Sequence, residues 1–359
     1  MRILDRYLLR EFANFSLLGI GAFIGIFIVV DLIEKVDLFI DHRTPPPTVA
    51  RYYLYALPAI LTQVIPISLL LGSLLGLGQL RKYNEVAAMQ GSGQSPWRLA
   101  RPLLAVALLV SIGQYALNEL AGPPAFARQK QILAEEIRQQ QAADRRSRSE
   151  VRLVGAGGRF WVARYFDAPT RTLRDVSVQM LHYPSLTRRI DARSASWNDG
   201  VWRFESGYVR AFEDSAEIAV PFRALVTTEP SEIPSDFSAA VKDPFFMSMR
   251  DLWVFARRVK ESGGEVQEHL TNFHIRASFP LADLVMVLLG TALSLRVVRG
   301  GNLAVGFGIS VSVGFAYFAL IRTGQALGYN GTLPPLAAAW LGNVVFGALG
   351  GLLFWKVAR

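Results

Sequence analysis

Long runs of uncharged, mostly apolar residues alternate along the chain with polar segments. Six runs have this character, three before a long polar region and three after it: 12–30, 52–80, 102–118, 277–295, 300–321 and 323–355. Asp283 is the one charged residue inside them. About 20 apolar residues form a helix that crosses a bilayer. The turn sequence "GYNGTLPP" predicts that the last helix begins near Leu336. The pattern therefore predicts three membrane helices, a polar insert and three more membrane helices.

Small residues are dense inside these runs, in "GIGAFIG", "LLLGSLLGLG", "GFGISVSVGF" and "GNVVFGALGG". Such residues let helix backbones approach closely, so these faces are candidates for packing on other helices. The alternative is that glycine is simply frequent in membrane helices.

The polar insert has the two-residue period of β-strands. Phe160 and Val162 are spaced two residues apart, and Val176, Val178 and Met180 alternate with polar residues. The sequence "WNDGVW" predicts a hairpin turn at its Asp-Gly pair, because glycine tolerates the positive φ of a tight turn. Several short strands without intervening helices are typical of a β-sandwich or a jelly roll.

Helical segments flank these strands. The charged stretch "RQKQILAEEIRQQQAADRRSR" predicts a helical stalk or linker before them. After them, Ser248 and Asp251 predict the capped start of a helix over residues 249–262 that Gly263 and Gly264 end. This second helix leads back to the membrane.

The composition favours a membrane protein over a soluble one. Hydrophobic residues make up 51% and charged residues 19% of the 359 residues. The net charge of +9 reflects cations on the cytoplasmic side of a membrane rather than nucleic-acid binding. With no cysteine, the chain has neither disulfides nor thiolate metal ligands. The basic, apolar N-terminus is longer than a signal-peptide core, so it is interpreted as a retained helix.

The cations also predict the orientation. Short segments on the side of the N-terminus contain Arg2, Arg6, Arg10, Arg81, Lys82, Arg98, Arg101, Arg296, Arg299, Lys356 and Arg359. Short segments on the other side contain Lys35, Arg43, Arg51 and Arg322. Because positive charges accumulate in cytoplasmic loops, both termini are expected in the cytoplasm and the insert outside it.

Motifs for catalysis or metal binding are absent from the sequence. It contains no G-x-x-x-x-G-K-[ST] phosphate loop and no H-E-x-x-H zinc motif. Glu265, His269 and His274 lie close together in the sequence but fit a solvated helix surface better than a metal site. We therefore expect neither an enzyme nor a cofactor-binding protein.

Charges at the end of the first run form a candidate lipid site. Asp31 and Lys35 are four residues apart and can neutralise each other on a helix. The alternative is that Lys35 meets an anionic ligand such as a lipid phosphate, since charges near membrane depth are often functional. Arg51 and Arg322, expected at the same level, are weaker candidates.

The segment "RKYNEVAAMQGSGQSPWRLARP", residues 81–102, is long for a connector between two spans. A helix from Tyr83 to about Gln90 would place Val86 and Met89 on one side, next to Glu85. Ser95 and Pro96 predict the start of the next helix. The apolar side suits either lipid headgroups or a groove on a cytoplasmic protein. Glu85 would pair with a cation of that protein or with Arg81 of its own helix.

Four stretches resemble the LptF/LptG family of lipopolysaccharide export permeases. They are "LDRYLLREF", "LLGLGQLRKYNEVAAMQGSGQSPWRL", "PLADLVMVLLGTALSL" and "GTLPPLAAAWLGNVVF". The insert matches more loosely, mainly at "ASWNDGVWRF". The "LDRY" and "GTLPP" elements are more similar to LptG than to LptF.

The resemblance implies an α-helical membrane protein with six transmembrane helices and a periplasmic β-jelly-roll domain between helices 3 and 4. Residues 1–121 would hold the first three helices, 122–272 the β-jelly roll, and 273–359 the last three. It implies a permease in the inner membrane of a Gram-negative bacterium that extracts lipopolysaccharide. The implied partners are a cytoplasmic ABC ATPase dimer, a second homologous permease and periplasmic jelly-roll bridge proteins.

Carried over by residue, the family's ATPase-coupling helix falls on residues 83–97, with Tyr83, Glu85, Val86, Met89 and Trp97. Its lipid-contacting cation falls on Lys35, where the acid directly before the lysine departs from the family pattern. Two other function classes remain: a permease for another lipid or lipoprotein, and a membrane sensor or scaffold that transports nothing.

Overall fold

The computed structural model describes residues 3–138, 147–155, 159–182, 185–198, 200–213, 216–229, 231–238, 247–261, 266–296 and 303–358. Its contacts divide the chain into two compact units. The helical unit consists of Met1–Ile132, Phe245–Trp253 and Gln267–Arg359, and the β unit of Leu133–Pro244 and Val254–Val266.

The helical unit contains the membrane spans. Within the described residues, six helical segments are long and apolar enough to cross a membrane, as predicted. Their helices are α1 (Ile3–Glu34), α3 (Pro46–Lys82), α5 (Pro96–Ala116), α9 (Gln267–Ser278) continued by α10 (Ala282–Arg296), α11 (Leu303–Tyr329) and α12 (Pro335–Ala358). α11 extends to Tyr329, past the predicted end at residue 321. α12 begins at Pro335, one residue before the prediction.

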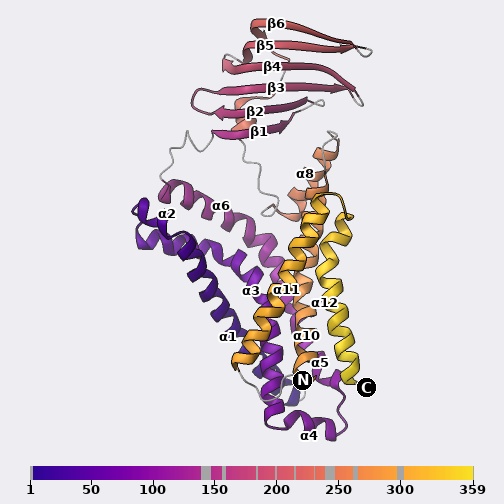
Figure 1. The fold of residues 1–359 in the computed structure, drawn as a ribbon. Coiled ribbons are helices and arrows are strands. Elements are labelled where there is room, and N and C mark those ends of the chain that lie inside the picture. Colours follow the sequence, from indigo (N-terminus) through magenta and orange to yellow (C-terminus); the bar gives the residue numbers. More distant parts are fainter. Residues whose placement is uncertain are drawn as a thin grey trace. The chain divides into compact units, whose positions relative to one another are not determined.

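Short helices connect the spans: α2 (Val36–Asp41), α4 (Glu85–Gly91), a π-helix (Leu117–Ala121), α6 (Gly122–Ile132), a second π-helix (Leu133–Ile137) and a 3₁₀ turn (Phe279–Leu281). Figure 1 shows both chain termini and α4 at one end of the helical bundle, and α2 at the other. An even number of spans places both termini on the same side of the membrane, so α4 belongs to that side.

α3 is the central helix of this unit. In its most apolar window 78% of the residues are buried, against 17% in α1. Gly72 of α3 faces α1, where an added Cβ would clash with the Ser16 side chain and lie 2.9 Å from the Phe12 carbonyl oxygen. Gly290 of α10 likewise faces Leu70 of α3. The prediction of close helix packing is thus confirmed at these glycines, whereas Gly21 has open space around it.

The β unit is an antiparallel sheet of six described strands in chain order. The strands are β1 (Arg148–Val154), β2 (Arg159–Asp167), β3 (Thr172–His182), β4 (Ser185–Asn198), β5 (Val201–Glu213) and β6 (Ala216–Thr227). The predicted β domain between the third and fourth spans is therefore confirmed. Its described strands form one sheet joined by hairpins, not the two stacked sheets of a sandwich, because every strand pairs with its sequence neighbour.

The predicted hairpin between β4 and β5 is present. Asn198 pairs with Val201, and Gly200 has a φ of 84°. Asp199, the other turn residue, lies outside the described residues. The predicted cap of α8 (Met249–Glu261) is also confirmed, because the Asp251 N–H donates to Ser248 Oγ at 3.0 Å. Gly263 and Gly264, the predicted end of that helix, lie outside the described residues as well.

The sheet is strongly curled. The rings of Trp161 on β2 and Trp202 on β5 have centroids 5.2 Å apart. In a flat sheet these strands would lie about 14 Å apart, since neighbours are about 4.8 Å apart. Phe237 of α7 (Pro234–Ser238) packs against both indoles, at 5.0 Å from Trp161 and 5.5 Å from Trp202. Aromatic side chains therefore fill the inner side of the curl.

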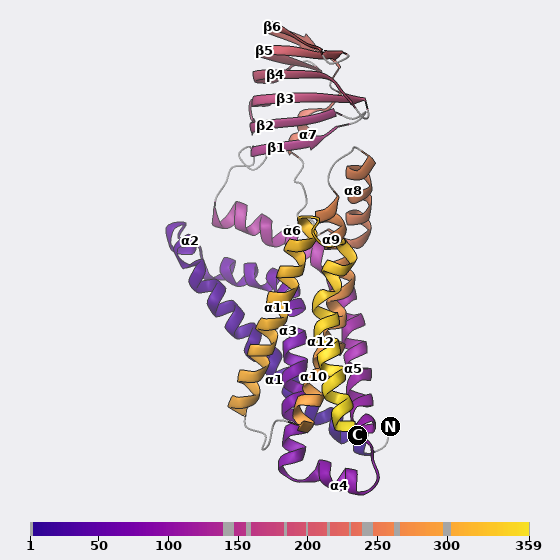
Figure 2. The ribbon, with the colours of Figure 1, turned by 45° about the vertical axis from the view of Figure 1, so that its right-hand side comes forward.

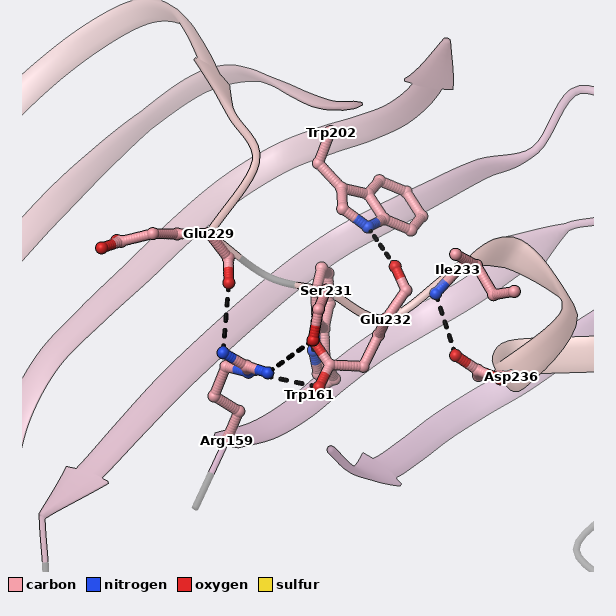
Figure 3. A network of polar contacts seen from close by, with 8 residues as sticks. All are labelled: Arg159, Trp161, Trp202, Glu229, Ser231, Glu232, Ile233 and Asp236. Atoms are coloured by element: carbon pink, nitrogen blue, oxygen red, sulfur yellow. Dashed lines mark hydrogen bonds and ion pairs between the residues drawn. The ribbon is translucent and has the colours of Figure 1, made fainter. Parts of the chain in front are cut away.

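A buried carboxylate fastens the segment before α7 to the sheet (Figure 3). Glu232 is 5% exposed and accepts hydrogen bonds from Arg159 Nε and Trp161 Nε1, both at 3.2 Å. Its backbone carbonyl accepts the Trp202 indole N–H at 2.7 Å. Arg159 also donates to the Glu229 carbonyl and to Ser231 Oγ. This network holds Phe237 in place over the inner side of the sheet.

Candidate coupling and lipid sites

The coupling segment, residues 81–102, forms a short helix at the end of the bundle that bears both termini (Figure 2). α3 ends at Lys82, and Asn84 takes a left-handed conformation, with a φ of 59°, that turns the chain into α4. α4 spans Glu85–Gly91, close to the predicted helix. Ser95 and Pro96 begin α5 as expected, although Ser95 makes no side-chain capping bond.

The apolar side of α4 packs into the chain's own core. Val86 and Met89 are 4% and 8% exposed and belong to a cluster with Leu8, Phe12 and Leu99. In this structure Val86 and Met89 thus face the chain's own core, and their contact with a groove on another protein stays a prediction. α4 packs on α3, and its two buried side chains lie in a cluster that also contains residues of α1 and α5.

The opposite side of α4 is exposed. Ala87 and Ala88 lie on it, and Gln90, next to Ala87 around the helix, is exposed as well. Tyr83, directly before the helix, is 62% exposed, and Trp97 at the start of α5 is 47% exposed. The Trp97 ring lies 5.0 Å from that of Phe354 in α12, so its orientation is fixed while one side remains open. These residues offer a firmly held surface of small and aromatic side chains.

Polar contacts hold both ends of the coupling segment. Tyr7 Oη donates to Glu85 Oε1 at 3.3 Å, and Arg98 Nη2 contacts the two carboxylate oxygens of Asp5 at 3.3 and 3.4 Å. Arg81 donates to the Ser294 carbonyl of α10. The partner of Glu85 is thus Tyr7, which neither alternative from the sequence foresaw. Beside α4, Arg81, Lys82 and Leu295 border a hollow of about 520 Å³.

A second, mostly apolar cavity of about 360 Å³ lies between α1, α3 and α11. Its lining residues are Phe23, Ile26, Phe27, Val30, Asp31, Glu34, Gln63, Val64, Ile67 and Phe318. Aromatic and aliphatic side chains form most of the wall, and Asp31 and Glu34 supply acidic groups toward the α2 end. Such a wall suits hydrocarbon chains.

Lys35 lies next to this cavity in a polar network. Its ammonium donates to both carboxylate oxygens of Asp31, at 2.7 and 2.8 Å, and to Tyr52 Oη at 3.0 Å. Tyr53 Oη donates to Asp31 at 2.9 Å. Partial burial lowers the pKa of Lys35, but the bonds to Asp31 and Tyr52 outweigh it and raise the pKa above its ordinary value. The i,i+4 pairing is thus present, and the two tyrosines that complete it were not predicted.

The two other predicted cations have separate surroundings. Arg51, in the second turn of α3, is exposed and donates to Thr48 Oγ1 at 3.4 Å. Arg322 of α11 is exposed and donates to Gln325 Oε1 at 2.8 Å. Gln325 in turn contacts Asn272 and Tyr329. Among the described residues, no group of three or more His, Asp or Glu side chains could hold a metal ion.

Comparisons with known proteins agree on one family. The family model "Lipopolysaccharide export system permease LptF/LptG" matches residues 6–356. The lipopolysaccharide export system permease protein LptG of Escherichia coli (strain K12) is 20% identical over 348 residues, which cover 96% of this chain and 95% of that protein. LptF of the same strain is 28% identical over 133 residues, 37% of this chain and 36% of that protein.

The family match covers both groups of membrane spans and the β unit between them. It explains why a multi-pass helical protein of the inner membrane carries an inserted antiparallel sheet. The chain belongs to the LptF/LptG family of lipopolysaccharide export system permeases.

Proposed function

We propose that this chain is the permease subunit of an ATP-driven exporter that extracts lipopolysaccharide from the inner membrane. A second homologous permease would complete the path, and a cytoplasmic ABC ATPase dimer would supply the energy. The β unit, in the periplasm, would pass the lipid to jelly-roll bridge proteins. The longer alignment to LptG supports the LptG-type role within the pair.

The exposed surface of α4 is the observation that supports docking of the ATPase on this chain. Ala87, Ala88 and Gln90 face outward, while Val86 and Met89 anchor the helix from beneath. A helix fixed by its own core can transmit force, because a push on its outer side moves the bundle that holds it. Tyr83 and Trp97 flank this outer side and would supply the aromatic contacts that protein interfaces favour.

The cavity between α1, α3 and α11 supports the proposal that this chain binds lipopolysaccharide. Its apolar wall would take acyl chains, and Lys35, with Arg51 and Arg322 on neighbouring elements, would meet phosphate groups. A volume of about 360 Å³ is small for a whole lipopolysaccharide. The second permease would therefore supply the opposite wall.

The test adds bulk and charge to the outer side of α4. Ala88→Arg should abolish co-purification of the ATPase, because an arginine on a small-residue surface blocks close approach. Ala127→Arg on α6, also an exposed alanine, is the matched control and should leave co-purification intact. Equal ATPase recovery from both variants would contradict docking at α4.

Orientation is tested with single cysteines in this cysteine-free chain. Ser92→Cys, after α4, should react with an impermeant maleimide only after the inner membrane is breached. Arg164→Cys, on β2 with 80% of its native side chain exposed, should react from the periplasm. The reverse labelling pattern would place the ATPase-docking and lipid-delivery surfaces on the wrong sides.

A further inference from the structure

The first two turns of α1 contact both ends of the coupling segment. Tyr7 donates to Glu85, the first residue of α4, and Asp5 pairs with Arg98 in the first turn of α5. Asp5 and Tyr7 both lie in the stretch "LDRYLLREF", to which the sequence alone assigned no role. The structure therefore gives this stretch a position against α4 and α5.

The two polar contacts flank an apolar stripe on α1. At about 100° per residue, Tyr7, Leu8, Phe12 and Asp5 follow one another around the helix in that order. Leu8 and Phe12, each 2% exposed, pack in the cluster that contains Val86 and Met89. A stripe of aliphatic and aromatic contacts alone permits α1 to roll against α4. A directional bond on each side of the stripe restricts that roll.

We propose that Asp5 and Tyr7 are positioning residues that lock the rotation of α1 against the coupling segment, so that movement of α4 is passed to α1. This inference rests on the proposed function, because it needs an ATPase that moves α4. Neither residue has to touch the ATPase. The Asp5 side chain is 19% exposed and already paired, and the Tyr7 hydroxyl is directed at Glu85.

A structural role and a role in transmitting movement predict different effects when the two contacts are removed. If the two contacts only stabilise the fold, their removal lowers the yield of the complex, and each complex that remains works normally. If they transmit movement, the complex assembles and hydrolyses ATP, but it moves less lipid per ATP. The number of lipid molecules released per ATP hydrolysed is therefore the deciding quantity.

The experiment uses the full permease pair with its ATPase, purified and reconstituted in liposomes that contain lipopolysaccharide. Tyr7→Phe removes one hydroxyl, and Asp5→Asn removes one charge. Each should lower lipid released per ATP by about 2- to 10-fold, the net effect of one ordinary hydrogen bond, while ATPase recovery stays at the wild-type level. Tyr55→Phe and Asp37→Asn, exposed positions outside the coupling segment, are the matched controls and should leave the ratio unchanged.

Two combined variants make the test specific. Tyr7→Phe with Glu85→Ala should be no worse than the more severe single variant, because both substitutions remove the same hydrogen bond. Asp5→Arg with Arg98→Asp restores an opposite pair and should recover most of the ratio that Asp5→Arg alone loses. An unchanged ratio in the single variants, or no recovery in the exchanged pair, would overturn the inference. A wild-type chain that recovers no ATPase would instead overturn the proposed function.

Discussion

Removal of the Glu232 carboxylate should open the β unit well before the rest of the protein unfolds. Glu232→Ala breaks an ion pair with Arg159, whose side chain is 20% exposed, and leaves the buried indole N–H of Trp161 without its acceptor. Removing one partner of a buried pair costs about 3–5 kcal/mol. For a domain of this size that is a fall of at least about 10 °C in the unfolding midpoint.

A buried reporter makes this measurable for the β unit alone. Ala195 on β4 is fully buried, so Ala195→Cys in the cysteine-free chain should react with a maleimide only when the sheet opens. Labelling is followed against temperature in the Ala195→Cys chain with and without Glu232→Ala. Glu232→Gln can still accept the Trp161 N–H, so its labelling midpoint should lie between those of the two chains.

The control is a carboxylate with an exposed partner. Glu205 pairs with Arg203 at 3.5 Å, and about half of each side chain is exposed. Such pairs contribute about 0–1 kcal/mol, so Glu205→Ala should shift the labelling midpoint by only a few degrees. If Glu232→Ala shifts it no further than Glu205→Ala, the buried network does not hold the sheet together.

Three further predictions concern α1. Gly72→Ala should lower the thermal stability of the purified protein by about 1–3 kcal/mol, because its Cβ meets Ser16 and Phe12, whereas Gly21→Ala should not; equal melting points would refute the close contact. Asp31→Asn releases Lys35 from its ion pair, so a photo-crosslinking residue in place of Tyr52, which contacts Lys35, should capture more phosphorylated lipid. An unchanged crosslinking yield would indicate that Lys35 has only a structural role. Phe23 of α1 and Phe307 of α11 stack at 5.2 Å, and we expect these two helices to separate when the cavity releases lipid. A short thiol crosslinker between Phe23→Cys and Phe307→Cys should therefore stop lipid release but not ATP hydrolysis, with the single-cysteine variants as controls; continued release would exclude this separation.

The membrane spans could be predicted because their signal is local. About 20 apolar residues in a row need no tertiary contact to be recognised. The β-hairpins could be predicted for the same reason, since strand alternation and the Asp-Gly turn are short-range features. Glu232 could not be predicted as a buried residue, because its partners Arg159 and Trp161 are more than 70 residues away in the sequence.

The coupling segment shows a different limit of sequence reasoning. The spacing of Val86 and Met89 indicates a helix with one apolar side, and that helix exists. The spacing cannot say whether the chain itself or another protein covers that side. The answer depends on tertiary packing, because the cluster that buries Val86 and Met89 also contains Leu8 and Phe12 of α1. The same packing brings Tyr7 to Glu85, a contact for which the sequence pattern offered no signal.

α1 touches each part of the proposed mechanism. Its first turns hold the coupling segment through Asp5, Tyr7 and the apolar stripe between them, and its middle contacts α3 at Gly72. Its last turns line the cavity and carry Asp31. Only 17% of its apolar window is buried, so most of its surface faces away from the rest of the helical unit, while its inner side packs closely on α3. A rigid helix about 48 Å long, fixed to α4 at one end and lining the cavity at the other, can carry a displacement between them without any change in the central helix α3.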